Sequence, residues 1–273
     1  MGSTPPLILV TNDDGIGSPG LRAAVEAVLP LGDVLVVAPK HQQSGAARSL
    51  PIDRGVTEKV AWAGPSNHEV TAFTVDGSPA LAVRSAILLY APRMPALVVS
   101  GINYGENVGV GITISGTVGA ALEAAATFGV PALAVSLQTR VEDHLSHNDN
   151  VDFTTAAFFT RSFAEIALRQ PLPPDVDILK IEIPSTATPE TPWRVTRVSR
   201  RPYFYSIVEE KSGRRDIEGY EPRVDPDRLE PESDVWALAI DRVVSVSPLS
   251  VDLTSATDRL SLDALLRSGS TQH

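Results

Sequence analysis

The chain has 273 residues, of which 43% are hydrophobic and 21% are charged, a composition typical of a globular protein with one or two domains. Its 23 Lys and Arg residues against 33 Asp and Glu give a formal net charge of −10, which argues against a broad surface for nucleic-acid polymers or anionic membranes. The absence of cysteine excludes disulfides, a thiol nucleophile and zinc held by thiolates. The sequence has no apolar run near the roughly 20 residues of a membrane span and no signal-peptide pattern, so we expect a cytoplasmic protein.

Strand-like and helix-like segments alternate along residues 7–140, and a further helix and strand are expected beyond the polar connection 137–150. Short, continuously apolar runs predict buried parallel strands, and longer stretches opened by Ser, Pro or Gly predict helices. The expected strands are 7–10, 33–38, 69–75, 96–100, 132–136 and 177–183. The expected helices are 21–29, 79–90, 116–128 and 152–169. This alternation predicts an α/β fold with a doubly wound, mostly parallel sheet and right-handed crossovers.

Beyond the last of these strands the composition changes. Residues 184–234 are rich in Pro, Arg, Glu and Asp, with extended pieces at 193–198 and 203–208. A stretch of this length does not form a simple loop in a compact domain, so we expect hairpins or an arm. A final strand at 236–246 and a terminal helix at 255–266 are predicted to follow.

This change divides the chain into a core, residues 1–183, and an extended C-terminal region, residues 184–273. We expect the second region to pack back on the core and to serve in oligomerisation. Exposed strand edges are normally paired or protected, and exchange of an element between identical subunits is one way to achieve this. A dimer or tetramer is therefore expected.

Two adjacent carboxylates stand at the end of the first expected strand. Asn12, Asp13 and Asp14 follow an apolar run and precede a glycine-rich turn, where ligands bind in open α/β sheets. Neighbouring carboxylates repel unless a cation lies between them or one is protonated, and a hard divalent ion with oxygen ligands resolves that repulsion. The alternative is a simple turn and helix cap, which Asn and Asp also favour.

Two further loops carry oxygen ligands after expected strands. In the first, Ser44 precedes Gly45, where the backbone permits close approach of a ligand; a plain turn is the alternative. The second, residues 100–109, presents Asn103 and Asn107 among three glycines. Amide oxygens are good ligands for Mg²⁺, Mn²⁺ or Ca²⁺, and a purely structural turn seldom needs two asparagines and three glycines.

Ser115, Gly116 and Thr117 open the helix expected at 116–128. The free N–H groups and the positive dipole end of a helix form an anion site, and the two hydroxyls add donors. A simple serine N-cap is the alternative. Phosphate-ester chemistry needs both a cation site and an anion site, and here the two are predicted at neighbouring strand ends.

Other site patterns are missing from the sequence. It has no P-loop, no dinucleotide fingerprint and no nucleophile elbow around a serine. The five histidines have no close metal spacing, and His144 and His147, in the polar connection 137–150, are expected to be solvated.

Several motifs occur in a fixed order along the first half of the chain. They are Val10-Thr-Asn-Asp-Asp-Gly-Ile-Gly-Ser-Pro-Gly20, Val37-Ala-Pro-Lys-His-Gln-Gln-Ser-Gly45, Val75-Asp-Gly-Ser-Pro-Ala80, Ser100-Gly-Ile-Asn-Tyr-Gly-Glu-Asn-Val-Gly109 and Ser115-Gly-Thr-Val-Gly-Ala-Ala121. Together they resemble the SurE family, the survival-protein nucleotidases. Ser245-Val-Ser-Pro-Leu-Ser-Val-Asp-Leu-Thr254 resembles the C-terminal strand motif of the same family.

The resemblance implies a Rossmann-like core with an extended β-rich arm that pairs with a second subunit. It also implies a metal-dependent phosphatase acting on nucleoside 5′- and 3′-monophosphates. The implied ligands of one divalent ion per subunit (Mg²⁺, Mn²⁺ or Ca²⁺) are Asp13, Asp14, Ser44 and Asn103. The implied phosphate contacts are Asn12, Gly45, Asn107, Ser115, Gly116 and Thr117. Asp13 and Asp14 would be the catalytic pair that orients or deprotonates the attacking water.

The chain departs from the family pattern at Val110 and Ile114, where polar or aromatic residues are frequent, and residues 184–234 match poorly. These departures bear on substrate preference. Our hypothesis is a phosphomonoesterase that hydrolyses nucleoside 5′- and 3′-monophosphates. The alternatives are a broad phosphatase acting on other phosphomonoesters, a non-catalytic nucleotide- or phosphate-binding protein, and a structural or adhesion domain.

Overall fold

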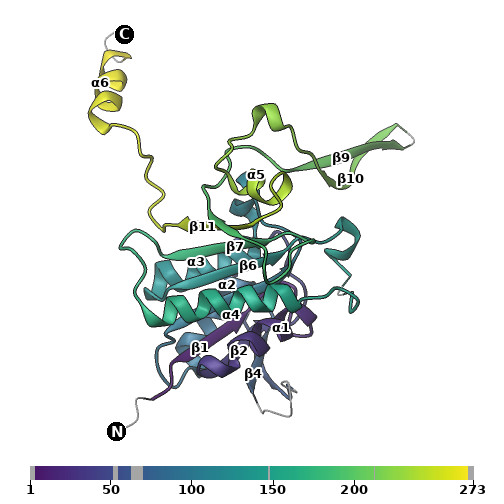
Figure 1. The fold of residues 1–273 in the computed structure, drawn as a ribbon, viewed down its shortest axis with the longest axis vertical. Helices are drawn as coiled ribbons and strands as arrows, with labels where there is room; N and C mark the ends of the chain where they lie inside the picture. The colour runs from purple at the N-terminus through teal and green to yellow at the C-terminus, as the bar shows by residue number, and fades with distance from the viewer. Residues whose placement is uncertain (1–3, 52–54, 63–69, 147, 212, 270–273) are drawn as a thin grey trace.

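The computed structural model describes residues 4–51, 55–62, 70–146, 148–211 and 213–269. In this part of the chain, a nine-stranded sheet in the order β3-β4-β2-β1-β5-β6-β7-β11-β8 forms the centre of the molecule (Figure 1). The pairs β3–β4 and β7–β11 are antiparallel and the other neighbours are parallel. The strands are β1 (Leu7–Thr11), β2 (Asp33–Pro39), β3 (Thr57–Val60), β4 (Thr71–Val75), β5 (Leu97–Tyr104), β6 (Ala132–Leu137), β7 (Ile178–Ile183), β8 (Trp193–Val195) and β11 (Val244–Leu249).

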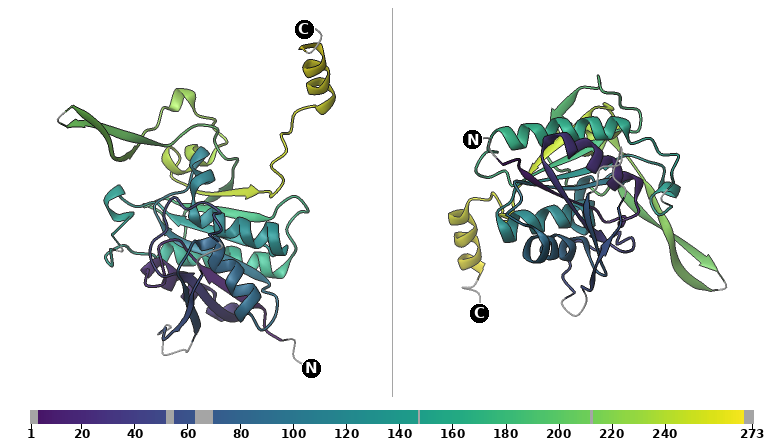
Figure 2. Two further views of the ribbon diagram at one scale, coloured as in Figure 1. Left: turned by 180° about the vertical axis from the view of Figure 1, so that it is seen from behind. Right: turned by 90° about the horizontal axis from the view of Figure 1, so that it is seen from below.

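Helices cover both faces of this sheet (Figures 1 and 2). The long helices are α1 (Pro19–Val28), α2 (Pro79–Ser85, continued by one π-helical turn), α3 (Gly116–Phe128) and α4 (Thr154–Arg169). Helices α1 and α4 pack on one face and α2 and α3 on the other. The expected doubly wound α/β fold is therefore confirmed.

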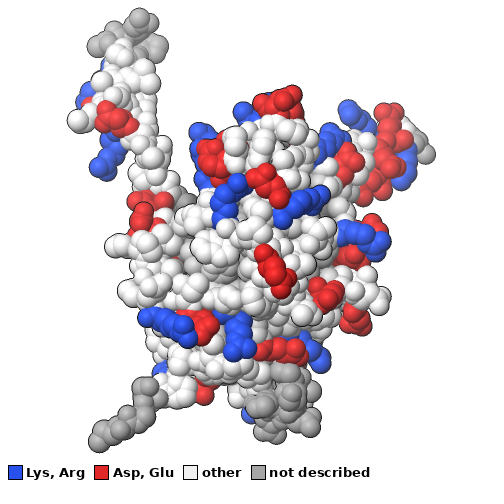
Figure 3. All heavy atoms as spheres, in the orientation of Figure 1, with Lys and Arg blue, Asp and Glu red and all other residues white. Residues whose placement is uncertain are grey.

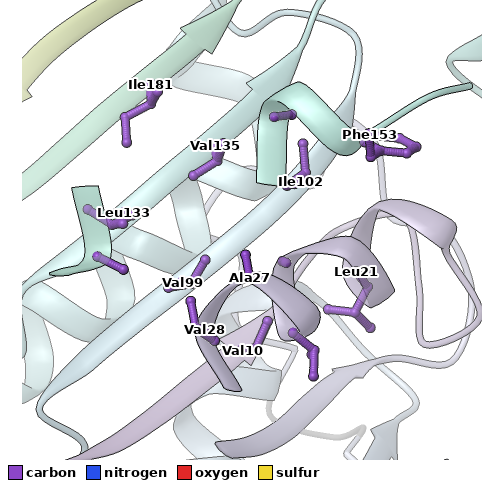
Figure 4. Close-up of a cluster of buried hydrophobic side chains, with 14 of the residues drawn as sticks. Val10, Leu21, Ala27, Val28, Val99, Ile102, Leu133, Val135, Phe153 and Ile181 are labelled. Atoms are coloured by element: carbon purple, nitrogen blue, oxygen red, sulfur yellow. The ribbon is translucent and has the colours of Figure 1, made fainter. Parts of the chain in front are cut away.

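Burial on both faces explains the continuous apolar strands. In β1, Ile8 and Val10 belong to the cluster under α1 and α4, whereas Leu7 and Leu9 belong to the cluster under α2 and α3. Successive side chains of a strand point to opposite faces, so a strand buried on both sides has no polar alternation. Figure 4 shows the first cluster, with Val10 among the side chains that neighbouring strands and α1 contribute.

The strand order reverses at β1. The chain runs outward through β2 and β4 on one side of β1, and then through β5, β6 and β7 on the other. Ligands bind outside the carboxyl ends of the strands at such a switch point. Because β1 ends at Thr11 and β5 at Tyr104, the two segments that follow these residues lie at the same edge of the sheet.

The C-terminal region completes the sheet and then leaves the body of the protein. β11 pairs with β7 and β8, so the sheet continues across the boundary placed at residue 183. A hairpin of β9 (Phe204–Lys211) and β10 (Arg214–Pro222) projects from the body, and α6 (Arg259–Gly269) stands at the end of an extended segment (Figures 1 and 2). This arrangement confirms the expected β-rich arm.

The strand predicted at 236–246 is wrong in its first half. A short helix, α5 (Asp234–Ala239), occupies that stretch, and β11 begins only at Val244. Ser233 caps the helix, since its Oγ accepts a hydrogen bond from Trp236 N. A short apolar run cannot be assigned to helix or strand by periodicity alone, and the Ser-Asp pair before it is the cap signal that decides.

Two strands were not predicted, β3 and β10, because charged residues make up much of both. Glu69, the first residue of the strand expected at 69–75, lies outside the described residues, as do His68, His147 and His273.

The surface carries both signs of charge. On the face drawn in Figure 3, acidic and basic side chains are interspersed over the body and along the hairpin. Within the described ranges, no helix is long and apolar enough to cross a membrane.

Candidate active site

The turn after β1 is shaped by its own first residue. Asn12 Nδ2 donates to Gly15 O and Asn12 Oδ1 accepts from Gly15 N, both at 3.1 Å. Gly15 has a φ of 103°, which a side chain would strain. Since the Asn12 side chain is buried, the structure gives it the role of holding the turn that presents Asp13 and Asp14. Its predicted contact with phosphate stays a prediction.

Asp13 lies against the first turn of α3. Its Oδ1 accepts a 2.7 Å hydrogen bond from Thr117 Oγ1. A β-carbon on Gly116 would lie 2.7 Å from both Cβ and Oδ2 of Asp13, so this approach requires glycine. Ser115 caps the helix, its Oγ accepting from Val118 N at 3.1 Å. The predicted cation site therefore lies directly at the positive end of the α3 dipole.

Gln42 joins Asp14 to Ser44. Its Nε2 lies 3.2 Å from Asp14 Oδ1, 3.1 Å from Ser44 Oγ and 2.7 Å from His144 O. Gly45, next along the loop, has a φ of 78° and open space where a β-carbon would stand. The loop after β2 thus brings Ser44 beside Asp14, as the ligand set requires, and leaves room for a ligand at Gly45.

Asn103 and Asn107 lie in the segment that leaves β5. Asn103 Nδ2 donates to the carbonyls of the next two residues, at 3.1 and 2.7 Å, which uses its amide hydrogens, so Oδ1 is the atom that could bind a cation. Tyr104 N donates to Asp14 Oδ2 at 3.4 Å, so Asn103 adjoins the aspartates. Asn107 lies farther along, with Nδ2 donating to Ser136 Oγ at 3.1 Å.

Burial dominates the electrostatics of the two aspartates, which are 4% and 1% exposed. Burial raises the pKa of Asp13, although hydrogen bonds from Thr117 and from backbone N–H groups, including that of Gly116, oppose the shift. Burial, and then the charge of Asp13, raise the pKa of Asp14 well above its usual range. A cation placed between two such buried carboxylates would favour their charged forms.

The donors around them suit a hard divalent ion. Among the described residues, no three His, Cys, Asp or Glu side chains gather into a metal-type cluster, so a cation here depends on the Ser44 hydroxyl and the Asn103 amide as well as the carboxylates. All four side chains offer oxygen ligands, which match Mg²⁺, Mn²⁺ or Ca²⁺. The residues present therefore fit the ion implied by the sequence.

The expectation of a solvated His144 is wrong. Its side chain is 7% exposed, and Nδ1 lies 2.9 Å from Tyr220 Oη. The ring also meets Phe204 edge-on, and burial lowers its pKa. The base of the β9–β10 hairpin buries it, a contact between distant parts of the chain that has no local sequence signal.

The sequence analysis did not identify Gln42 as part of the site. Its position two residues before Ser44 is the signal that could have indicated its contact with Ser44 and Asp14.

The fold and this site together define an α/β protein with an oxygen-lined, acidic centre beside a helix N-terminus at the switch point of its sheet. A family model described as "Survival protein SurE" matches residues 8–204. The chain belongs to the SurE family.

Named relatives extend over nearly the whole chain. A "5′-nucleotidase SurE" of Thermococcus kodakarensis is 39% identical over 91% of this chain and 93% of its own length. One from Myxococcus xanthus is 41% identical over 93% of this chain and 91% of its own length. The crystal structure of the SurE protein from Aquifex aeolicus superposes with a TM-score of 0.76 at 31% identity, covering 96% of this chain and 100% of that one.

Proposed function

We propose that this protein is a metal-dependent phosphomonoesterase that hydrolyses nucleoside 5′- and 3′-monophosphates to nucleoside and phosphate. The observation that carries the proposal is the contact of Asp13 with the start of α3 through Gly116 and Thr117, which joins a cation-binding carboxylate to an anion-binding helix end. The relatives named 5′-nucleotidase support the same reaction class.

The helix start would hold the phosphoryl group. Ser115 contributes a hydroxyl and Gly116 allows the backbone to come close, whereas Thr117, whose hydroxyl donates to Asp13, would contribute its backbone N–H. Partial positive charge at a helix N-terminus stabilises a phosphate oxygen, and does so more strongly in a buried site. Gly45 and Asn107 would border the same group from neighbouring loops.

Asp13, Asp14, Ser44 and Asn103 would hold one Mg²⁺, Mn²⁺ or Ca²⁺ per subunit. When bound, such an ion lowers the pKa of water and neutralises charge on the phosphoryl group. The aspartates would orient the attacking water and accept its proton. Thr117 fixes one oxygen of Asp13, and Gln42 and Tyr104 N fix the oxygens of Asp14, so the pair is held in place before substrate arrives.

Release of inorganic phosphate tests this proposal. A panel of 5′- and 3′-nucleoside monophosphates, a diphosphate, a triphosphate and an aryl phosphate is assayed with Mg²⁺, with Mn²⁺ and with excess chelator. We expect turnover of monophosphates in the presence of metal and its loss in chelator. Full activity in chelator would refute metal dependence, and a clear preference for ATP would refute the monophosphate site.

The ester group beyond the phosphate would meet an apolar surface. Val110 and Ile114, which lie between Asn107 and Ser115, are 43% and 63% exposed. This surface supports acceptance of aryl phosphates alongside nucleotides, and the same panel measures that preference.

Self-association and a cytoplasmic location are part of the proposal. The arm carries exposed apolar side chains, among them Val208 and Ile217 on the hairpin and Leu260 on α6. Val208 and Ile217 face each other across the hairpin, and exposed apolar patches are characteristic of an interface, which supports a dimer or tetramer. The cysteine-free composition is in keeping with the cytoplasm.

A further inference from the structure

The segment between Asn103 and Ser115 joins the two halves of the site, and buried charges hold its middle. It passes from β5 to α3 only through turns and a 3-10 helix. Buried backbone groups outside regular structure need other hydrogen-bond partners. Here Lys180, Glu182 and Asp234 supply them, and all three side chains are fully buried.

Lys180 and Glu182 hold both backbone groups of Asn107. Glu182 Oε2 accepts from Asn107 N at 2.8 Å, and Lys180 Nζ donates to Asn107 O at 2.9 Å. The two side chains stand two residues apart on β7, hence on the same face, with Lys180 Nζ 3.4 Å from Glu182 Oε1. Asn107 is thereby fixed from two sides by one ion pair.

Asp234 completes this charge set from the C-terminal region. Its Oδ2 lies 3.0 Å from Lys180 Nζ and accepts from Gly109 N at 3.1 Å. Its Oδ1 accepts from Ser199 N at 2.9 Å. The first turn of α5 is therefore part of the support for a loop of the site.

Asn107 is the group that this support presents. From Gly101 to Gly109 it is the one half-buried position, and all its neighbours in that stretch are buried. One of its two amide hydrogens goes to Ser136 Oγ, which leaves the other for a ligand. Buried ion pairs add little stability compared with apolar replacements. The presence of three buried charges is therefore better explained by the geometry that they impose on Asn107.

We propose that Lys180, Glu182 and Asp234 are positioning residues for the reaction, which fix Asn107 so that its remaining amide hydrogen meets a phosphoryl oxygen of the substrate. This inference rests on the proposed function. A hydrogen bond to a phosphate oxygen is charge-assisted and depends steeply on geometry, and a misplacement of about 1 Å lowers rates on the order of a hundredfold.

A double-mutant cycle between Glu182 and Asn107 tests this assignment. We measure kcat/KM for AMP with Mn²⁺ in Asn107→Ala, in Glu182→Gln and in the double variant. Each single change should lower kcat/KM by about ten- to a hundredfold, and the double variant should be no worse than Asn107→Ala, because Glu182 acts through Asn107. Affinity for Mn²⁺ alone should be unchanged in calorimetry.

Glu123→Gln is the matched control. Glu123, on α3, is equally buried and is paired with Arg84 of α2 and with Arg48 of the loop after β2, so the variant loses a comparable carboxylate without touching the support of Asn107. We expect it to keep wild-type kcat/KM. If Glu182→Gln fails to fold in urea titrations, Asp234→Asn, which retains an acceptor for Gly109 N, takes its place in the cycle.

Two results would overturn the inference: losses that multiply in the double variant, or wild-type kcat/KM in a folded Glu182→Gln protein. Failure of the proposed function looks different, since the wild type itself would then release no phosphate from AMP. In that case calorimetry with inorganic phosphate and Mn²⁺ decides the inference. The inference is supported if Asn107→Ala and the double variant bind phosphate equally, and both more weakly than the wild type. It is refuted if all variants bind phosphate as the wild type does, or if none of the proteins binds it.

Discussion

Gly116 lies so close to Asp13 that a β-carbon on the glycine would fall 2.7 Å from the Cβ and from Oδ2 of the aspartate. The start of a helix and the end of a strand therefore meet without a side chain between them. Thr117 adds a 2.7 Å hydrogen bond to Oδ1, so both carboxylate oxygens of Asp13 are located by α3. The elements proposed to bind phosphate and metal are thereby assembled as one unit.

Replacing Gly116 by alanine should abolish most activity while leaving a folded protein. Alanine normally favours a helix over glycine by about 1 kcal/mol, but here its methyl group would push Asp13 away from Thr117. We expect kcat/KM to fall on the order of a hundredfold. Gly111→Ala is the control, because nothing lies within 4 Å of the β-carbon it would add. Equal activity of the two variants would contradict the role given to this contact.

Asp14→Asn should eliminate turnover and yet stabilise the metal-free protein. The folded-state pKa of Asp14 lies well above its usual 3.8, so the folded state retains a proton that the unfolded chain has already lost. Between these two pKa values the free energy of unfolding falls as pH rises, by up to about 1.4 kcal/mol per pH unit. The asparagine variant lacks this decline.

Urea denaturation in excess chelator, from about pH 4 to about pH 8, measures the difference. The difference in free energy of unfolding between Asp14→Asn and the wild type should widen as pH rises. Added Mn²⁺ should reduce this difference by stabilising the wild type. Asp152→Asn is a control of opposite sign, because the hydrogen bond from Thr154 lowers the pKa of Asp152 and its charge stabilises at neutral pH. If the free energy of unfolding of the wild type and of Asp14→Asn changed in parallel with pH, burial of Asp14 would not raise its pKa as proposed.

Gln42→Ala should weaken metal binding without removing a ligand. Gln42 Nε2 holds Asp14 Oδ1 and Ser44 Oγ together, and residues that orient metal ligands typically contribute ten- to about a hundredfold in affinity. Calorimetry with Mn²⁺ should show a loss in that range. Gln43→Ala, one position along the same loop, keeps the backbone bond from residue 43 to Asp13 O and should bind Mn²⁺ as the wild type does. Wild-type affinity in Gln42→Ala would mean that the loop positions Ser44 unaided.

Substitution of Leu265 by glutamate should weaken self-association. Leu265 and Leu266 on α6 are 67% and 65% exposed, and burying each leucine against another subunit contributes about 1.5–3 kcal/mol. Light scattering at micromolar concentration should give at least a dimer for the wild type and a lower mass for Leu265→Glu. Thr257→Glu, which adds the same charge without removing apolar surface, should keep the wild-type mass. A monomeric wild type with full activity would refute the proposed assembly.

The sequence was sufficient to predict an element or a site residue where the local hydrophobic pattern and the burial agree. Leu7 to Val10 are continuously apolar because both faces of β1 are covered, and Asp13 and Asp14 follow at a strand end, so their place at the site could be predicted. The same reasoning placed Ser44 and Asn103 beside the aspartates, as the structure does, and their role as metal ligands stays a prediction. Trp236 was misassigned because its short apolar run fits helix and strand equally well, and Ser233 decides through its cap.

The features that the sequence did not predict depend on contacts between distant parts of the chain. His144 sits in a polar stretch, and only the hairpin that returns with Phe204 and Tyr220 buries it. Lys180 and Asp234 form an ion pair although they are 54 positions apart in the sequence. No periodicity in either segment predicts this pairing. Partners of this kind are decided by topology, which a single sequence does not display.

The insertion of β11 beside β7 fixes the order in which the protein can be completed during synthesis. Until residues 244–249 have left the ribosome, β7 is an open edge, and Lys180 lacks the carboxylate of Asp234 for most of that time. Open strand edges invite pairing with other chains. The nascent protein therefore exposes this open edge from the time β7 emerges until β11 follows it and pairs with it.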